Sequence, residues 1–217
     1  MKYGESIFDI LYLLFALAAG ILLLVRGRTS AGRKMGCAAL ILSGGDAFHL
    51  VPRVLDYFVK ADFTAALGVG KLITSVTMTV FYVLLYLIYL DHFDIKENRK
   101  VTWTVYLLSI VRIALCLFPQ NHWLENESDP LWGIIRNVPF ALLGALVAVL
   151  FFCVRNQSRP LRFVWLYVTL SFLFYLPVAV AAGLLPILGM LMLPKTVCYI
   201  LLIAAFLISN REVDNAD

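Results

Sequence analysis

Five ionisable residues follow one another at helical spacing within an apolar part of the sequence. They lie in the segment SGGDAFHLVPRVLDYFVK, three, four, three and four positions apart: Asp46, His49, Arg53, Asp56 and Lys60. This spacing places all five side chains on one face of an α-helix. A carboxylate, an imidazole and a guanidinium in that arrangement have the chemistry to bind an ion or to exchange a proton.

Asp46 and His49 are the candidates for acid–base chemistry. At positions i and i+3 they could share a proton, which suits proton coupling or general-base catalysis on a lipid, although a purely structural pair is the simpler interpretation. His49 is predicted at mid-membrane, His92 on the cytoplasmic side and His122 in an outer loop. The three histidines therefore cannot converge, and no metal site is predicted. The four cysteines lie singly in apolar segments, without the paired spacing of metal or disulfide sites. No nucleotide-binding or hydrolase motif occurs.

The composition is that of a membrane protein. Of 217 residues, 62% are hydrophobic and only 15% are charged, and the mean hydropathy is +0.88. Water-soluble domains have roughly half apolar and a quarter charged residues. Apolar runs of about 18 residues recur along the whole chain, which predicts repeated membrane crossing. The net charge of +4 comes from basic residues between these runs, a distribution that excludes a nucleic-acid-binding surface.

We predict an all-α, polytopic membrane protein in which residues 1–217 form a single seven-transmembrane-helix bundle. The opening MKYGESIFD is acidic as well as basic and has no small-residue cleavage site, so we expect a retained first helix and not a cleavable signal. The connections are short, so consecutive helices should be antiparallel neighbours. The predicted helices are 7–25, 36–58, 68–90, 101–118, 131–154, 162–182 and 186–209.

The basic residues between the helices predict the orientation. The connections after the first, third and fifth helices hold four, three and three Lys or Arg, and the C-terminal tail holds one, which makes eleven. The opposite side holds two, Lys2 and Lys60. Because cytoplasmic loops are enriched in Lys and Arg, the N-terminus should lie outside and the C-terminus in the cytoplasm. The predicted location is the cell membrane, as a multi-pass protein.

Five basic residues remain inside the predicted helices: Arg53, Lys71, Arg112, Arg136 and Lys195. Arg112 is the most informative, because it follows only 11 uncharged residues of its helix and so lies about 16 Å from the cytoplasmic edge, close to mid-membrane. A guanidinium keeps its proton, so it must face protein or water and not lipid. Lys71 and Arg136 lie near the outer edge, where extension to the headgroups is an equal alternative.

The predicted depth of Lys195 in the membrane depends on where the last helix begins. A helix from Pro186, kinked at Pro194, places Lys195 about two turns deep, whereas a helix from Pro194 places it at the outer surface. The longer helix is favoured because the shorter one barely spans a bilayer. The third helix presents a second polar and aromatic face, which either lines the same space or packs between helices: Lys71, Ser75, Thr79, Tyr82, Tyr86 and Tyr89.

The outer half of the bundle therefore holds up to five cations against Asp9, Asp46 and Asp56, a surplus of about two positive charges. This surplus predicts an outward-facing cationic cavity that an anion completes. Arginine suits carboxylate or phosphate through its bidentate fork. The predicted ligand-binding residues are Arg53, Arg112, Arg136, Lys195, Lys71, Asp46, His49 and Tyr82.

Three functions are open at this point. The first is transport or sensing of a small anionic ligand or lipid headgroup, anchored by Arg112 and Arg53. The second is a membrane-embedded enzyme acting on a lipid, with His49 and Asp46 as acid and base. The third is a structural or assembly subunit whose charges are paired internally, as Arg53–Asp56 and Asp46–Arg112. The short tail and loops mean that a signalling role would need a cytoplasmic or membrane protein partner.

Seven helices with a lysine in the last one resemble microbial rhodopsins in outline, and that resemblance would imply retinal held as a Schiff base. The segment MLPKTVCYI lacks the acidic residue that those proteins carry one turn before the lysine, and the third helix offers no carboxylate counterion. No cofactor is therefore predicted.

Overall fold

The computed structural model describes residues 2–125, 130–181 and 185–216. Within these ranges the chain is all-helical and contains no strand, which confirms the predicted fold class at that level. The α-helices are α1 (Lys2–Arg26), α2 (Ser30–Phe58), α3 (Thr64–His92), α4 (Arg99–Leu117), α5 (Pro130–Val154), α6 (Val164–Ala181) and α7 (Met192–Ala216). Two 3-10 helices precede α5 and α7, namely η1 (Pro119–Asn121) and η2 (Pro186–Leu191).

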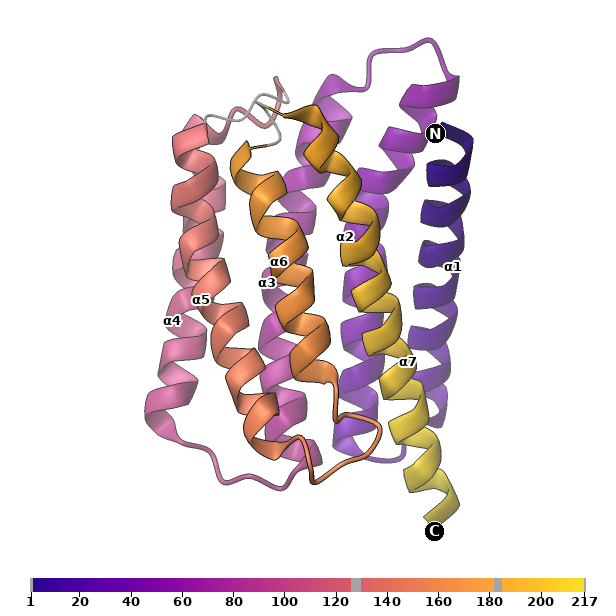
Figure 1. The fold of residues 1–217 in the computed structure, drawn as a ribbon, viewed down its shortest axis with the longest axis vertical. Helices are drawn as coiled ribbons and strands as arrows, with labels where there is room; N and C mark the ends of the chain where they lie inside the picture. The colour runs from indigo at the N-terminus through magenta and orange to yellow at the C-terminus, as the bar shows by residue number, and fades with distance from the viewer. Residues whose placement is uncertain (1, 126–129, 182–184, 217) are drawn as a thin grey trace.

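The seven α-helices form a closed up-and-down bundle (Figure 1). Each helix packs against the next one in the sequence, and α7 returns to pack against α1. The connections are short, which forces consecutive helices to run antiparallel. One end of the bundle therefore holds the N-terminus together with the α2–α3, α4–α5 and α6–α7 connections, and the opposite end holds the C-terminus (Figure 1).

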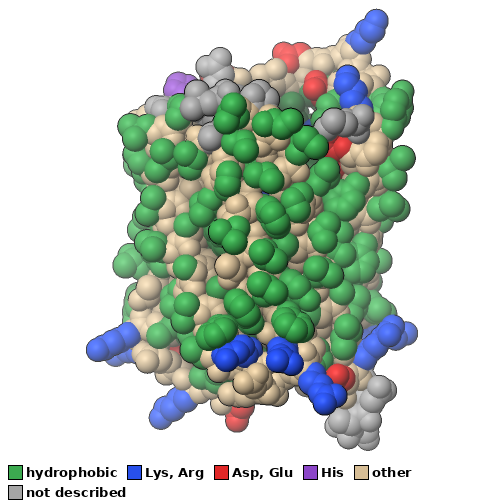
Figure 2. Space-filling model, viewed as in Figure 1, with side chains coloured by type: hydrophobic (Ala, Val, Ile, Leu, Met, Phe, Trp, Pro, Cys, Tyr) green, Lys and Arg blue, Asp and Glu red, His purple; other side chains and the backbone are tan. Residues whose placement is uncertain are grey.

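The outer surface of the bundle is apolar. Within the described residues, six helices are long and apolar enough to cross a membrane, and Val164–Val180 of α6 is a shorter apolar helix. Large hydrophobic side chains cover the middle of the molecule, with Lys and Arg gathered mainly at the lower end (Figure 2). Exposed examples from four helices are Leu14, Val51, Leu107 and Val149. Apolar surface of this extent suits contact with lipid and indicates a multi-pass membrane protein.

The helix ends differ from the predicted ones where polar residues start a helix. We expected the first two helices at 7–25 and 36–58, but α1 begins at Lys2 and α2 at Ser30. Thr29 is the N-cap of α2 and accepts a hydrogen bond from the Gly32 N–H at 3.0 Å. The prediction placed the start of this helix too late because the segment RGRTSAGRK is rich in basic residues, which is typical of a connection. The last residue of the predicted sixth helix, 182, lies outside the described residues.

The segment before Lys195 consists of two helix types. Residues Pro186–Leu191 form η2, and α7 begins at Met192, so that Pro194 falls in the first α-helical turn, where proline is tolerated. A change from 3-10 to α-helix thus replaces the expected kink at Pro194. The Lys195 side chain is only 8% exposed, so it is packed within the bundle.

Helices α2 and α3 approach each other closely at two glycines. A Cβ atom on Gly45 would lie 1.9 Å from Oγ1 of Thr77, and one on Gly70 would lie 2.2 Å from the carbonyl oxygen of Phe48. Pro52 has no N–H, so it leaves the Phe48 carbonyl without its usual helical donor. Small residues allow such close contact between helix backbones. The contact fixes α2 against α3 at the level of the cavities described next.

Candidate functional site

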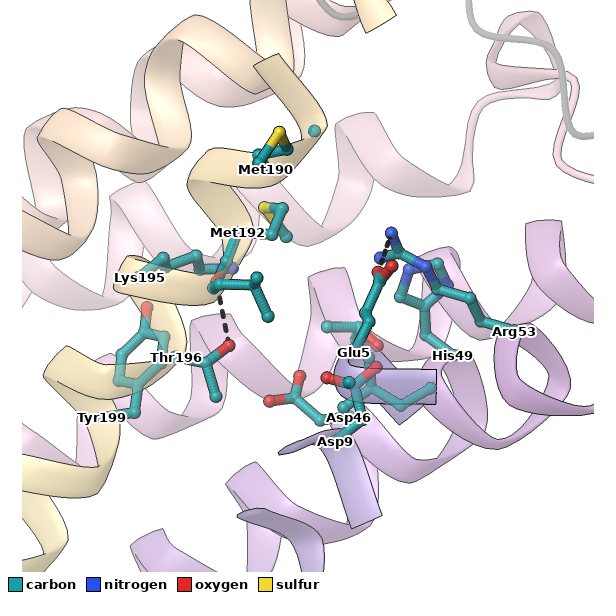
Figure 3. Close-up of a pocket in the computed structure, with 15 residues that line it drawn as sticks. Glu5, Asp9, Asp46, His49, Arg53, Met190, Met192, Lys195, Thr196 and Tyr199 are labelled. Carbon is teal, nitrogen blue, oxygen red and sulfur yellow. Dashed lines mark hydrogen bonds and ion pairs between the residues drawn. The ribbon is translucent and has the colours of Figure 1, made fainter. Parts of the chain in front are cut away.

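A cavity of about 520 Å³ lies at the end of the bundle that holds the N-terminus (Figure 3). Its walls come from α1, α2, α3, η2 and α7, and its size falls in the range of small-molecule sites. The ionisable acidic and basic side chains that line it are Glu5, Asp9, Asp46, His49, Arg53 and Lys195. Three of the helix-two residues predicted to share one face, at positions 46, 49 and 53, thus line a common space.

A second cavity of about 470 Å³ adjoins the first and shares His49, Arg53 and Lys195 with it. Its walls extend to α5 and α6, and it adds three charged side chains: Asp56, Lys71 and Arg136. Four basic side chains therefore line the two cavities, each from a different helix, namely Arg53 (α2), Lys71 (α3), Arg136 (α5) and Lys195 (α7).

Arg53 forms a salt bridge with Glu5 (Figure 3). The Tyr57 hydroxyl donates a hydrogen bond to Glu5 at 3.2 Å and accepts one from Nε of Arg53 at 3.4 Å. This pair takes the place of the Arg53–Asp56 pair considered from the sequence. Glu5 was missed because it precedes the predicted start of the first helix. The signal was present, since acidic residues are favoured in the first turn of a helix.

Asp46 accepts a hydrogen bond from the Tyr12 hydroxyl at 2.7 Å. Within the described part of the chain it shares no hydrogen bond with His49 and no salt bridge with Arg112, so neither of the partners considered from the sequence is present. Nδ1 of His49 is buried and has no hydrogen-bond partner among these residues. Acid and base are therefore close along α2 but not coupled to each other.

Asp9 and Lys195 are the two deeply buried charged groups of the first cavity. Asp9 is 5% exposed and Lys195 is 8% exposed. Neither makes a hydrogen bond or an ion pair through its charged group to any residue that the structure describes. The ammonium of Lys195 lies 4.7 Å from the centre of the Tyr175 ring and 5.6 Å from that of Tyr199. Such cation–π contacts hold the ammonium without neutralising its charge.

Arg112 is buried, with 1% of its surface exposed, which confirms that its guanidinium faces protein. It lines neither cavity. Its Nη1 donates a hydrogen bond to the backbone carbonyl of Arg136 at 2.5 Å, and its Cζ lies 5.2 Å from the centre of the Phe140 ring. These contacts join α4 to α5. The predicted role of Arg112 as an anchor for the ligand therefore has no support in its position.

Arg136 lines the second cavity and also takes part in the contact between α4 and α5. Its Nη1 donates to Oδ1 of Asn121 at 2.6 Å, and its Cζ lies 4.5 Å from the centre of the Trp123 ring. Asn121 also closes the end of α4, because its Nδ2 donates to the carbonyls of Leu115 and Phe118 at 2.8 Å each. The α4–α5 connection thus fixes one side of the guanidinium.

The polar face predicted on the third helix divides into two parts. Lys71 and Ser75 line the second cavity, whereas Tyr82 lies in the core beside Ser171, with 3.3 Å between the hydroxyl oxygens. Tyr82 lines neither cavity, so the packing alternative describes it better than ligand binding does. Tyr86 is likewise buried and shares a hydrogen bond of 2.6 Å with Thr102.

The structure changes the charge balance that the sequence suggested. Glu5 joins the site and Arg112 leaves it, so four acidic side chains, Glu5, Asp9, Asp46 and Asp56, accompany the four basic ones. The expected surplus of about two positive charges is therefore absent from these two cavities. The charges are nevertheless separated. All four acidic side chains lie on α1 and α2, where Arg53 pairs with Glu5, whereas the other three basic side chains lie on α3, α5 and α7: Lys71, Arg136 and Lys195.

Among the described residues, no group of three or more His, Cys, Asp or Glu side chains is arranged to hold a metal ion. The chain matches no known protein family, no curated protein and no solved structure. The function must therefore be inferred from the site itself.

Proposed function

We propose that the chain is a multi-pass protein of the cell membrane with its N-terminus outside and its C-terminus in the cytoplasm. The apolar outer surface and the six long apolar helices support insertion in a bilayer. The bias of Lys and Arg toward the end that holds the C-terminus supports this orientation (Figure 2). In this orientation both cavities lie in the outer half of the bundle.

We further propose that the cavities bind the anionic group of a small molecule or of a lipid headgroup, for transport or sensing. The observation that carries this proposal is that basic side chains from four helices, Arg53, Lys71, Arg136 and Lys195, line two adjoining cavities. Away from bulk water, the attraction between such cations and an anion is stronger than at a wet surface. Guanidinium groups add bidentate hydrogen bonds to carboxylate or phosphate.

The unpaired state of Lys195 favours ligand binding over a purely structural role. A structural or assembly subunit would pair its buried charges internally, because an unpaired buried charge is costly. Within the described residues Lys195 has aromatic neighbours but no acidic partner at ion-pair distance. An enzyme with His49 and Asp46 as acid and base is less favoured, because the hydrogen bond of Asp46 goes to Tyr12.

Binding of simple anions to the purified protein tests this proposal. Ethyl phosphate and propionate serve as probes, titrated calorimetrically into protein in neutral maltoside micelles. We expect at least one of them to bind, and Lys195→Met or Lys71→Met to weaken that binding by about tenfold, the effect of losing one charge-assisted contact.

Lys34→Met is the matched control. Lys34 pairs with Asp91 at 2.5 Å near the start of α2, at the opposite end of the bundle from the cavities, so its loss should leave binding unchanged. The proposal is contradicted if the folded wild-type protein binds neither soluble probe and also fails to bind a short-chain anionic lipid, phosphatidylethanol, in the same micelles. Equal weakening by all three substitutions would contradict it as well.

A further inference from the structure

The first cavity presents opposite charges on opposing walls. Lys195 extends from α7, and Asp9 and Asp46 extend from α1 and α2 (Figure 3). All three line the same space of about 520 Å³. Among the described residues, Lys195 and Asp46 line this cavity together without forming an ion pair. The cavity thus keeps a positive and a negative side apart.

The buried charges on the two sides lack partners of their own. Asp9 is 5% exposed and Lys195 is 8% exposed, and neither charged group has a hydrogen bond or ion pair within the described residues. Asp46 has the Tyr12 hydroxyl as a donor at 2.7 Å, which leaves its other oxygen available. Buried ionised groups are normally paired, because desolvation without compensation is expensive. A single ligand that carries both a positive and a negative group would compensate Asp9 and Lys195 together.

The neighbouring Arg53–Glu5 salt bridge shows the contrast. Those side chains lie closer to solvent, at 28% and 19% exposure, and they neutralise each other directly. Aromatic rings hold the Lys195 ammonium, which positions it toward the cavity without neutralising it.

We propose that the ligand is a zwitterion, with a primary ammonium bound by Asp9 and Asp46 and an anionic phosphate or carboxylate bound by Lys195. This inference rests on the proposed function and extends it, because it adds a second, positively charged group to the anion. The ammonium supplies three donors, which suits two carboxylates on adjacent helices. Free amino acids or amino phosphates and the headgroup of phosphatidylethanolamine share this chemistry.

Matched pairs of compounds that differ only in the amino group test the inference on the wild-type protein. The soluble pairs are phosphoethanolamine against ethyl phosphate and β-alanine against propionate. The lipid pair is short-chain phosphatidylethanolamine against phosphatidylethanol, added to protein in neutral maltoside micelles. We expect the amino compound to bind tighter than its partner by about tenfold or more, because a site built around a polar group rejects the analogue that lacks it.

The pattern of preference identifies the source of the ligand. Preference in a soluble pair indicates a free small molecule, and preference confined to the lipid pair indicates a headgroup; either result supports the zwitterion. If both members of each pair bind equally, or the compound without the amino group binds tighter, the zwitterion is ruled out while the anion site stands. If no compound binds at all, the proposed function itself fails.

Substitution of Asp9 or Asp46 tests where the ammonium group of the ligand binds. Asp9→Asn should remove the preference for the amino compound while the affinity for ethyl phosphate or propionate stays within about twofold of the wild-type value or rises, because a negative charge is lost. Asp91→Asn is the matched control at the opposite end of the bundle and should retain the preference. Asp46→Asn provides a second variant should Asp9→Asn fail to fold. Retention of the full preference in a folded Asp9 or Asp46 variant would overturn the assignment.

Discussion

Gly70→Ala should separate α2 from α3 and disturb the two cavities that both helices line. A Cβ atom on Gly70 would lie 2.2 Å from the carbonyl oxygen of Phe48 and 2.8 Å from Cα of His49. Both contacts are to backbone, so no rotation of a side chain can relieve them. Ordinary contact begins at 3.4 Å, so the helices must move apart by about 1.2 Å at this point.

The expected cost follows from this displacement. Overpacking of a well-packed interior costs about 1–3 kcal/mol, and the higher helix propensity of alanine returns at most about 1 kcal/mol. We expect a net loss of up to about 2 kcal/mol in the free energy of unfolding. Because His49 lines both cavities, the shift should also weaken binding of the anionic probes.

Gly44→Ala is the matched control, since nothing lies within 4 Å of a Cβ atom at that position. It should leave stability unchanged or raise it by up to about 1 kcal/mol through helix propensity. The free energy of unfolding can be measured for both variants by equilibrium denaturation in mixed detergent micelles. Equal stability of the Gly70→Ala and Gly44→Ala proteins would refute the close contact between α2 and α3.

Three further substitutions test individual contacts, each by the same unfolding measurement. Tyr12→Phe removes the hydrogen bond to Asp46 and should cost about 1.5–3 kcal/mol, as expected for a bond to a charged group; an unchanged stability would mean that water replaces the hydroxyl at no cost. Asn121→Ala leaves the end of α4 and one nitrogen of Arg136 without partners and should cost about 2–4 kcal/mol, and a loss below about 1 kcal/mol would contradict its capping role. Asp91→Asn breaks a partly exposed pair and should cost no more than about 1 kcal/mol; a larger loss would show that this pair is not a surface interaction.

Spacing along one helix was a sound guide to what lies on one face. The steps of three and four that join Asp46, His49 and Arg53 bring all three to the same cavity. The burial of Arg112 was also predictable, because its short helix offers no register that would move the charge away from the centre of an apolar segment. Its burial follows from the cost of placing a guanidinium in hydrocarbon.

Partners across helices could not be predicted in the same way. Helical periodicity gives the face of each helix but not the rotation of one helix against another, so Arg112 contacts the carbonyl of Arg136 and not Asp46. Glu5 fell before the predicted start of the first helix because apolar residues begin after it, although α1 extends back to Lys2. Because Glu5 lines the first cavity and Arg112 lines neither cavity, the expected surplus of positive charge is absent. Acidic and basic side chains lie instead on different walls of the cavities.

The central claim is that an anion binds beside Lys195 in the cavity between α1, α2 and α7. Anomalous diffraction from crystals soaked in selenate, a tetrahedral anion with a distinctive signal, tests it most directly. The account predicts an anomalous peak next to the Lys195 ammonium that is absent from crystals of Lys195→Met. Peaks confined to the opposite end of the bundle, around Lys34 and Arg155, would contradict it.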